Sequence, residues 1–266
     1  MPHNRGMNES PITSRDNPVY KRLKKLADSS RARREARMTL LDGEHVLAAY
    51  LDAGGSPATL VRAVSLDAAR LAPIAARCPQ ARIVTLPDPL FAALSPVATP
   101  GGVLAEAAWL SPPAIEAVPL IVVLEDIQDP GNLGAMLRTA AAAGATGAVL
   151  SPGCHDPWSP KALRGGQGAQ FVLPLQTGVD LVTWLAGFAG DSLALALGEN
   201  TRLYDRVLTH PLALLVGNEG AGLSPAARAA ATATVSIPMA GQVESLNAAA
   251  ALAVAVFEVA RQRAGP

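Results

Sequence analysis

The sequence predicts an α/β protein, in which a small α/β module precedes a larger domain built on a parallel sheet flanked by helices. From Leu120 onward, short and fully apolar runs alternate with helical stretches. Apolar strands that alternate with helices are typical of a parallel sheet covered on both faces. Residues 1–40 are more basic than the rest of the chain, and 266 residues are enough for two domains.

The N-terminal module is expected to span residues 11–106, after a flexible leader at 1–10. Asn17-Pro18 opens a helix in which apolar residues recur at a spacing of three to four. A helical stretch over 44–53 ends at Gly54-Gly55. Short strands are expected at 61–64, 83–86 and 103–105.

The larger domain is expected to span residues 119–264, after a proline-containing linker at 107–118. Its strands are expected at 120–124, 147–150, 171–175, 193–197, 212–216 and 234–237. Its helices are expected at 132–143, 180–189, 225–231 and 246–263.

Composition favours a globular, cytoplasmic protein. Hydrophobic residues make up 50% of the chain, and no apolar run approaches the roughly 20 residues that span a bilayer. The N-terminus is polar and basic, without the apolar core of a secretory signal. Cys78 and Cys154 lack the CxxC spacing of a zinc site, so both are expected as free thiols. The sequence therefore predicts no membrane partner and no required metal.

Basic residues are concentrated at the start of the chain. Residues 1–40 hold ten Lys and Arg against four Asp and Glu, a net charge of +6 in a chain whose formal net charge is zero. This excess favours contact with a polyanion such as RNA, and a solvated helix face is the alternative. The candidate RNA-binding residues are Lys21, Arg22, Lys24, Arg31 and Arg34.

The first of three candidate loops, residues 129–134, follows the strand expected at 120–124. Asn132 is expected as the N-cap of the next helix. Arg138 lies one turn beyond Gly134, and helical side chains lean toward the N-terminus. Free N–H groups and a guanidinium then converge where a phosphate fits. A tight turn beside a surface arginine is the alternative explanation.

The second and third loops follow later strands. Residues 217–224 carry three glycines around Glu219, which allow the backbone to approach a ligand closely. Their spacing is not GxGxxG, which argues against a nicotinamide dinucleotide. The third loop runs from Ile237 into an alanine-rich helix, with Ser245 expected as N-cap and Asn247 in the first turn. All three loops follow strands of one parallel sheet, and ligands bind beyond the carboxyl ends of such strands.

These loops resemble the three signature motifs of the SpoU (TrmH-like) family of SPOUT RNA methyltransferases. Asn132 to Arg138 resembles the first motif, 217–224 the second, and 237–239 with 245–247 the third, in the family's order. Residues 159–169 resemble the stretch between the first two motifs, except that Gly166-Gln167 stands where many members are rich in Ser. The N-terminal module is similar, more loosely, to the family's ribosomal-protein-like substrate-binding domain, through Ser14, Asn17-Pro18, Lys21, the basic run to Arg37, and Gly43-Glu44.

The resemblance implies a deep trefoil knot, a homodimer with the site near its interface, and S-adenosylmethionine as the cofactor. By position in the motifs, the cofactor-binding residues are Val216, Gly217, Asn218, Gly220, Ile237, Met239 and Leu246. The alanine-rich helix 246–260 suits a dimer interface, and packing within the subunit is equally compatible.

The implied activity is methylation of a ribose 2′-hydroxyl in structured RNA (EC 2.1.1). The N-terminal module favours large-subunit (23S) ribosomal RNA over transfer RNA. A non-catalytic RNA-binding or ribosome-assembly protein and a different nucleotide enzyme are the rival classes.

The resemblance also assigns roles to the catalytic residues. Arg138 is the family's catalytic residue, and because arginine stays protonated we expect it to stabilise the developing alkoxide rather than to act as base. Asn132 is expected to hold Arg138 or a phosphate and Glu219 to order the second loop. Ser245 and Asn247 are expected to position the target nucleotide. His155 is a weaker candidate base.

Overall fold

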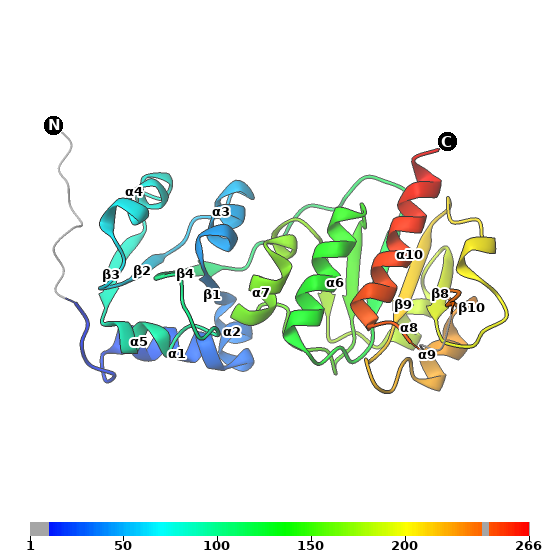
Figure 1. Cartoon of the computed structure of the whole chain (residues 1–266), viewed down its shortest axis with the longest axis horizontal. Coiled ribbons are helices and arrows are strands. Elements are labelled where there is room, and N and C mark those ends of the chain that lie inside the picture. Colours follow the sequence, from blue (N-terminus) through cyan, green and yellow to red (C-terminus); the bar gives the residue numbers. More distant parts are fainter. Residues whose placement is uncertain (1–10, 241–244, 266) are drawn as a thin grey trace. The chain divides into compact units, whose positions relative to one another are not determined.

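The computed structural model describes residues 11–240 and 245–265, and the leader expected at 1–10 lies outside them. The chain divides into two compact units (Figure 1). The first unit holds the chain up to Leu110 together with Trp158–Phe171, and the second holds Ser111–Pro157 and the chain from Val172 onward. Residues 158–171, which the sequence-based boundaries place in the larger domain, thus fold with the first unit.

The first unit is built on a mixed sheet with the strand order β1-β4-β2-β3. Strand β4 is antiparallel to both β1 and β2, whereas β2 and β3 are parallel. The strands are β1 (Met38–Asp42), β2 (Thr59–Ala63), β3 (Arg82–Leu86) and β4 (Val103–Ala108). The helices before Leu110 are α1 (Pro18–Asp28), α2 (Ser30–Ala36), α3 (Glu44–Asp52), α4 (Ala68–Arg77) and α5 (Asp88–Ala92).

Helix α7 (Pro160–Gly166) and the 3₁₀ turn Ala169–Phe171 complete the first unit. The Thr39 hydroxyl on β1 donates to the carbonyl of Trp158 over 2.6 Å. The buried ring of Phe171 meets Tyr50 of α3 edge-on, with ring centroids 5.2 Å apart. The strand expected at 171–175 is therefore wrong, because Phe171 is held in the first unit and the strand begins only at Leu175.

The second unit is built on a parallel sheet with the strand order β10-β8-β9-β5-β6-β7. This arrangement confirms the predicted parallel sheet. The strands are β5 (Leu120–Leu124), β6 (Gly147–Leu150), β7 (Leu175–Thr177), β8 (Asp191–Leu195), β9 (Leu212–Val216) and β10 (Ala233–Val235). The helices are α6 (Pro130–Ala142), α8 (Leu181–Ala186), α9 (Pro225–Ala230) and α10 (Ala248–Arg263), with a 3₁₀ turn at Leu203–Asp205.

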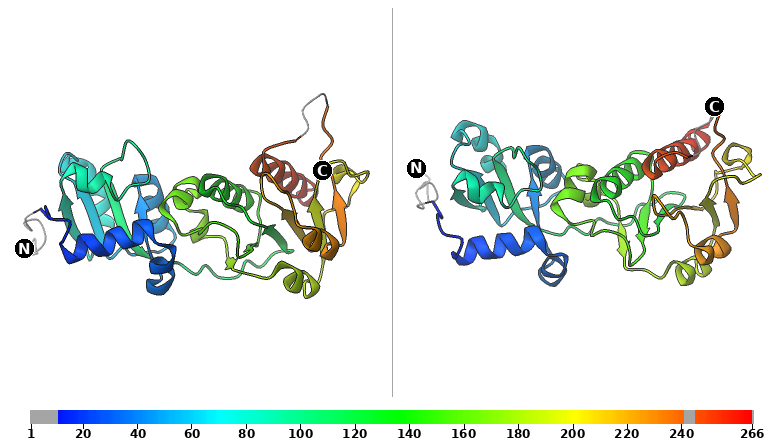
Figure 2. Two further views of the ribbon diagram at one scale, coloured as in Figure 1. Left: turned by 90° about the horizontal axis from the view of Figure 1, so that it is seen from below. Right: turned by 60° about the horizontal axis from the view of Figure 1, so that its bottom comes forward.

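Helices cover both faces of this sheet. On one face, Leu185 of α8 and Ala227 of α9 pack with Val123 and Leu215 of the central strands. Helices α6 (green) and α10 (red) lie next to each other in every view (Figures 1 and 2). Since all the strands of this sheet run parallel, the loops that follow them leave from the same edge of the sheet.

Two helices begin at residues other than those expected. Asp129, not Asn132, is the N-cap of α6, and its carboxylate accepts from the Asn132 amide over 2.8 Å. Asn247, not Ser245, is the N-cap of α10 and accepts from the backbone N–H of Ala249 and Ala250. Within the part of the chain that the structure describes, no helix is long and apolar enough to cross a membrane.

Candidate active site

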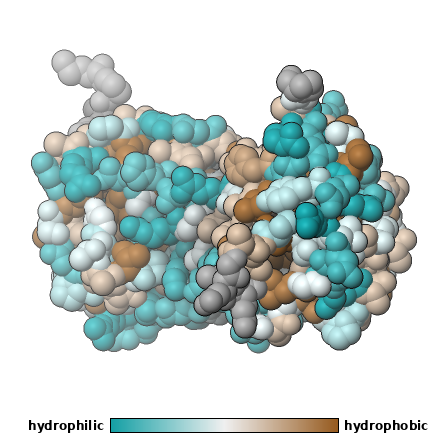
Figure 3. Space-filling view, turned by 45° about the vertical axis from the view of Figure 1, so that its right-hand side comes forward, coloured by the Kyte–Doolittle hydropathy of each residue, from teal (hydrophilic) through white to brown (hydrophobic). Residues whose placement is uncertain are grey.

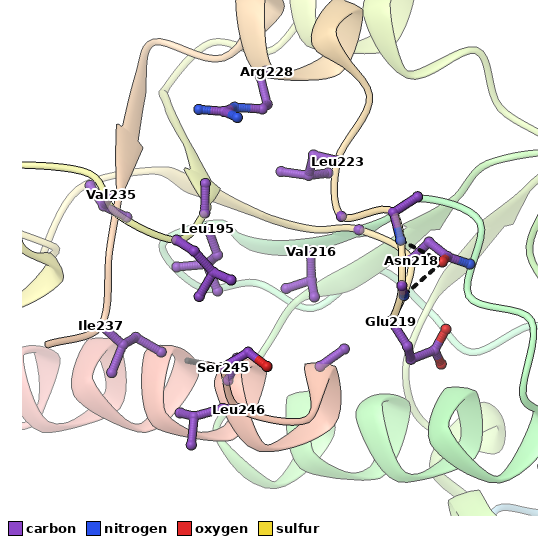
Figure 4. Close-up of a pocket in the computed structure, with 18 of the residues that line it drawn as sticks. Leu195, Val216, Asn218, Glu219, Leu223, Arg228, Val235, Ile237, Ser245 and Leu246 are labelled. Atoms are coloured by element: carbon purple, nitrogen blue, oxygen red, sulfur yellow. Dashed lines mark hydrogen bonds between the residues drawn. The ribbon is translucent and has the colours of Figure 1, made fainter. Parts of the chain in front are cut away.

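A pocket of about 370 Å³ lies beyond the carboxyl ends of β8, β9 and β10. Its walls are the end of β8, the loop after β9, the segment after β10 and the first turns of α10 (Figure 4). The volume is in the range of small-molecule sites. All seven residues predicted to bind a cofactor line it, namely Val216, Gly217, Asn218, Gly220, Ile237, Met239 and Leu246.

The loop after β9 is a closed turn that its own sequence builds. The backbone of Asn218 exchanges two hydrogen bonds with that of Gly222, at 3.1 and 2.9 Å. The Asn218 side-chain oxygen accepts from the amides of Gly220 and Ala221. A Cβ on Gly217 would lie 2.2 Å from the backbone of Gly222, so a side chain there would open the turn. The pocket wall is thus preorganised.

Strand β5 anchors this loop from the neighbouring position in the sheet. Both oxygens of Glu125 accept from Ser224, one from its amide and one from its hydroxyl, each over 2.7 Å. The Asn218 amide donates to the carbonyl of Asp126 over 2.9 Å. The residues that directly follow β5 and the second loop therefore form one connected structure at the carboxyl edge of the sheet.

The first loop reaches the pocket through Asn132. The side-chain Nδ2 of Asn132 donates to the Glu219 carboxylate over 3.0 Å, and Glu219 lines the pocket. The structure thus joins Asn132 to Glu219, whereas the sequence-based expectation was that Asn132 holds Arg138 or a phosphate. Ser245 also lines the pocket, while the Asn247 side chain is used as a helix cap.

Arg138 lies on the exposed surface of α6 and does not line the pocket. Among the described residues its guanidinium has no hydrogen-bond or ion-pair partner, so it is available to a ligand. Cys154, in the loop after β6, donates to the Leu124 carbonyl over 3.2 Å. Burial raises the pKa of the Cys154 thiol, which argues against a cysteine nucleophile near this edge.

The predicted RNA-binding residues of the first unit are mostly paired with acidic groups of their own unit. Arg22 makes a two-pronged ion pair with the buried carboxylate of Glu106, with both distances 2.8 Å. Lys21, Lys24 and Arg31 pair with Asp16, Asp28 and Glu35 respectively. Arg34 is exposed and has no ion-pair partner among the described residues.

Sequence reasoning missed several lining residues. Residues 195–197, at and just beyond the end of β8, and Arg228 of α9 line the pocket, and Figure 4 shows Leu195 and Arg228 among them. The strand at 193–197 was expected, but its place beside β9 depends on the strand order, which apolar runs do not reveal. Arg228 lies four residues after Ser224 on a short helix, and that spacing offered a usable hint.

The departure at Gly166-Gln167 has a packing explanation. A Cβ on Gly166 would lie 2.3 Å from the side-chain oxygen of Gln170. Gln170 is fully buried and donates to the carbonyl of Ala162 over 3.2 Å. A residue without a side chain at 166 therefore makes room for Gln170.

The fold and the pocket together define a class of protein, an enzyme with a nucleoside-sized site at the carboxyl edge of a parallel sheet. Residues 119–257 match the family model described as SpoU rRNA Methylase family. The chain belongs to this family, and is an RNA methyltransferase whose family uses S-adenosylmethionine.

Three known proteins show the extent of the similarity. An uncharacterised tRNA/rRNA methyltransferase of Synechocystis is 35% identical over 260 residues, which cover 95% of this chain and 94% of that protein. The 23S rRNA (guanosine-2′-O-)-methyltransferase RlmB of Pseudomonas putida is 37% identical over 158 residues, covering 56% of this chain and 61% of RlmB. The crystal structure of the SpoU methyltransferase AviRb from Streptomyces viridochromogenes, in complex with AdoMet, has a TM-score of 0.80 at 27% identity and covers 94% of this chain and 100% of that one.

The pocket fits S-adenosylmethionine in size and in chemistry. Apolar side chains, among them Leu195, Val216 and Ile237, offer a surface for an adenine ring (Figure 4). The glycine-rich turn presents backbone groups to a ribose. Glu219 and Arg228, the latter ion-paired with Glu199, place opposite charges at different parts of the lining (Figure 4), where the ammonium and the carboxylate of the cofactor would find partners.

Proposed function

We propose that this protein methylates a ribose 2′-hydroxyl of structured RNA, with S-adenosylmethionine held in the pocket at the ends of β8, β9 and β10. The observation that carries the proposal is that residues from the second and third motifs line one pocket, to which Asn132 of the first motif is hydrogen-bonded through Glu219. Three loops distant in the sequence thus serve one site. The clustering supports the assignment of Val216, Gly217, Asn218, Gly220, Ile237, Met239 and Leu246 to cofactor binding.

Bound S-adenosylmethionine supplies an electrophilic methyl group on a sulfonium. The ribose 2′-oxygen forms the new bond to this carbon as the carbon–sulfur bond breaks, and the hydroxyl proton must leave. Glu219, fixed by Asn132, keeps the glycine-rich turn in place beside the reacting centre. Ser245, two residues before the N-cap of α10, orients the target nucleotide. Asn247 caps the helix that follows and so holds this segment in place.

Arg138 stabilises the negative charge that develops on the 2′-oxygen. An arginine stays protonated in proteins, so it donates hydrogen bonds instead of accepting the proton. The proton passes to a phosphate oxygen of the substrate. The lack of any intramolecular partner for Arg138 among the described residues supports this role.

Large-subunit (23S) ribosomal RNA is the proposed substrate. The similarity of 56% of this chain to RlmB, whose name states a 23S guanosine 2′-O activity, supports it. The first unit is proposed to act as the family's ribosomal-protein-like RNA-binding domain. Arg34, together with the paired cations Lys21, Arg22, Lys24 and Arg31, would supply phosphate contacts. Transfer RNA is the second candidate, because the full-length Synechocystis relative is named for both substrates.

We also propose the trefoil knot and the homodimer of the family for this chain. Ala250 and Phe257 of α10 are exposed and Val254 between them is half-buried, which leaves an apolar stripe along the helix. The space-filling view shows further apolar surface on the second unit among polar groups (Figure 3). An exposed apolar stripe of this kind supports the proposal that a second copy of the chain packs against α10. The proposed location is the cytoplasm, without a membrane or metal partner.

Two measurements test the proposed function. Calorimetry should detect binding of S-adenosylmethionine and of S-adenosylhomocysteine. The protein should transfer labelled methyl groups to protein-free large-subunit ribosomal RNA, and nucleoside analysis should find 2′-O-methylated ribose. Methyl transfer to a base, or to transfer RNA alone, would contradict the proposed substrate group or the proposed RNA. Absence of cofactor binding would contradict the proposal as a whole.

A further inference from the structure

A second pocket, of about 220 Å³, lies in the first unit at the turn between β1 and α3. Its lining comes from that turn (Asp42 to Val46), from Arg70 of α4, from Gly101 and from Arg164 and Gln167 at the end of α7. None of these residues belongs to the cofactor pocket. The proposed function gives this second pocket no task.

Asp42 is one of the residues that line the pocket, and one of its carboxylate oxygens has no hydrogen-bond partner. Its side chain has no exposed surface. Oδ2 accepts from the Ser95 hydroxyl over 2.8 Å, whereas the buried Oδ1 has no partner. Burial raises the pKa of Asp42. A buried carboxylate oxygen without a donor is costly, so a ligand that brings an N–H to Oδ1 would be favoured once the Asp42 side chain turns toward the pocket.

The rim of the same pocket carries groups that suit a phosphate. Helix α3 begins here with Gly43 as its N-cap, and no side chain caps it, so its first N–H groups are open to an anion. The Arg164 guanidinium lies over Gly43, 3.4 Å from where a Cβ would be, and 3.6 Å from Asp42 Oδ2. At that separation Arg164 is an ion-pair partner of Asp42 without a hydrogen bond to it, and a phosphate contact would draw Arg164 away from this long ion pair. Arg70, paired with Glu44, is also on the rim.

We propose that this pocket binds one unpaired nucleotide of the substrate RNA, with its phosphate against the start of α3, Arg70 and Arg164, and a base N–H donated to Asp42 Oδ1. The inference rests on the proposed function, because it assigns the pocket to the same RNA. An inorganic anion alone satisfies the rim but brings no donor for Asp42. A metal cation suits the carboxylates of Asp42 and Glu44 but would have to displace the arginines paired with them, and the positive end of the helix repels it. A nucleotide offers a phosphate to the rim and an N–H donor to Asp42.

The chain offers a matched pair of variants for the phosphate end. Arg70 and Arg77 both lie on α4, and both pair with a carboxylate of α3, Glu44 and Asp52 respectively. Arg70 lines the pocket and Arg77 does not. With protein-free large-subunit ribosomal RNA as the probe, Arg70→Gln and Arg164→Gln should each weaken binding about tenfold. Each should also reduce the slope of log affinity against log salt by roughly 0.7–0.9. Arg77→Gln should change neither quantity.

Asp42→Asn tests the base end. The amide keeps the size of the side chain and removes the charge, so RNA binding should weaken about threefold or more while the salt slope stays that of the wild type. A change in affinity without a change in salt slope separates base contact from phosphate contact. Calorimetry with S-adenosylmethionine should give the wild-type affinity in all four variants.

A direct measurement does not depend on the substrate assignment. Nucleoside 5′-monophosphates added to the full-length ¹⁵N-labelled protein should shift the amide signals of residues 43–46 and 101, and Arg164→Gln should abolish those shifts. Equal RNA affinity for Arg70→Gln and Arg77→Gln, or shifts confined to residues 216–223, would overturn the inference. If the wild type bound neither RNA nor cofactor, the proposed function would fail, while shifts at 43–46 would still support a nucleotide site.

Discussion

Gly217 shows at the residue scale how a single missing side chain shapes the cofactor pocket. Replacement by alanine would put a Cβ 2.2 Å from the Gly222 backbone, and the closed turn would have to open. Gly217→Ala should therefore reduce affinity for S-adenosylmethionine at least about tenfold, the cost of a small overpacking defect. Gly220→Ala is the matched control, because its Cβ would meet only the Asn218 oxygen at 3.6 Å. Calorimetry should show a much smaller loss for Gly220→Ala, and equal losses would contradict this account.

Arg138 is expected to act on the transition state and not on the cofactor. Arg138→Ala should lower single-turnover methyl transfer at least about 100-fold, the scale of one charge-stabilising donor. Its affinity for S-adenosylmethionine should stay near that of the wild type, since Arg138 lies outside the pocket lining. A near-normal transfer rate in the variant would show that the 2′-oxygen is stabilised by another group.

We expect the buried Asp42 carboxylate to lower the free energy of unfolding of the ligand-free protein at neutral pH. Burial raises the pKa of Asp42 above its ordinary value of 3.8, so between the unfolded-state pKa and the higher folded-state pKa the folded protein binds more protons than the unfolded chain. Stability attributable to Asp42 is then highest at low pH and falls as pH rises through the folded pKa. Asp42→Asn should melt at a higher temperature than the wild type at pH 7, with the difference shrinking toward acid. Melting curves across this pH range that stay parallel would contradict the prediction.

The site residues could be predicted best from the sequence where they are consecutive along the chain. The glycine-rich loop at 217–224 is one connected segment, and its lining residues could be named in advance. Helix caps were less predictable, because Asp129, Asn132, Ser245 and Asn247 are all good capping residues and only the path of the chain decides among them. The bond between Asn132 and Glu219 joins residues 87 positions apart, which no local pattern contains.

At the scale of elements, α7 packs against β1, a strand that precedes it by more than a hundred residues. Phe171→Ala would leave a cavity against Tyr50 in the first unit and should destabilise that unit by about 3–5 kcal/mol. Hydrogen exchange should then show reduced protection of β1 and α3 amides, with β5 and β9 amides unaffected. Loss of protection confined to the second unit would mean that Phe171 supports the other core.

The same element explains where the strand assignments failed. Apolar runs at 120–124, 147–150 and 212–216 became strands with the expected bounds. The run from Phe171 to Leu175 is also apolar but contains Pro174, and its first residue packs in another unit while only Leu175 enters the sheet. Periodicity describes which residues are buried and leaves open which core buries them.

For the whole molecule, the apolar stripe on α10 predicts association of two copies. Phe257→Glu would place a charge on the stripe and should yield a monomer in sedimentation velocity experiments at concentrations where the wild type is a dimer. Val207→Glu is the control, because Val207 is more exposed than Phe257, at 68% against 51%, and lies off that helix. A monomeric wild type, or equal effects of both changes, would rule out α10 as the interface.

The placement of Trp158–Phe171 has a consequence for the order in which the chain acquires structure during synthesis. The first unit lacks α7 until residue 171 has emerged from the ribosome, by which time β5, α6 and β6 have also been made. An emerging N-terminal unit would therefore expose the surface that later receives Trp158 and Phe171. Nascent chains stalled before and after residue 171 should differ in protease resistance of the first unit, although both contain all of its strands.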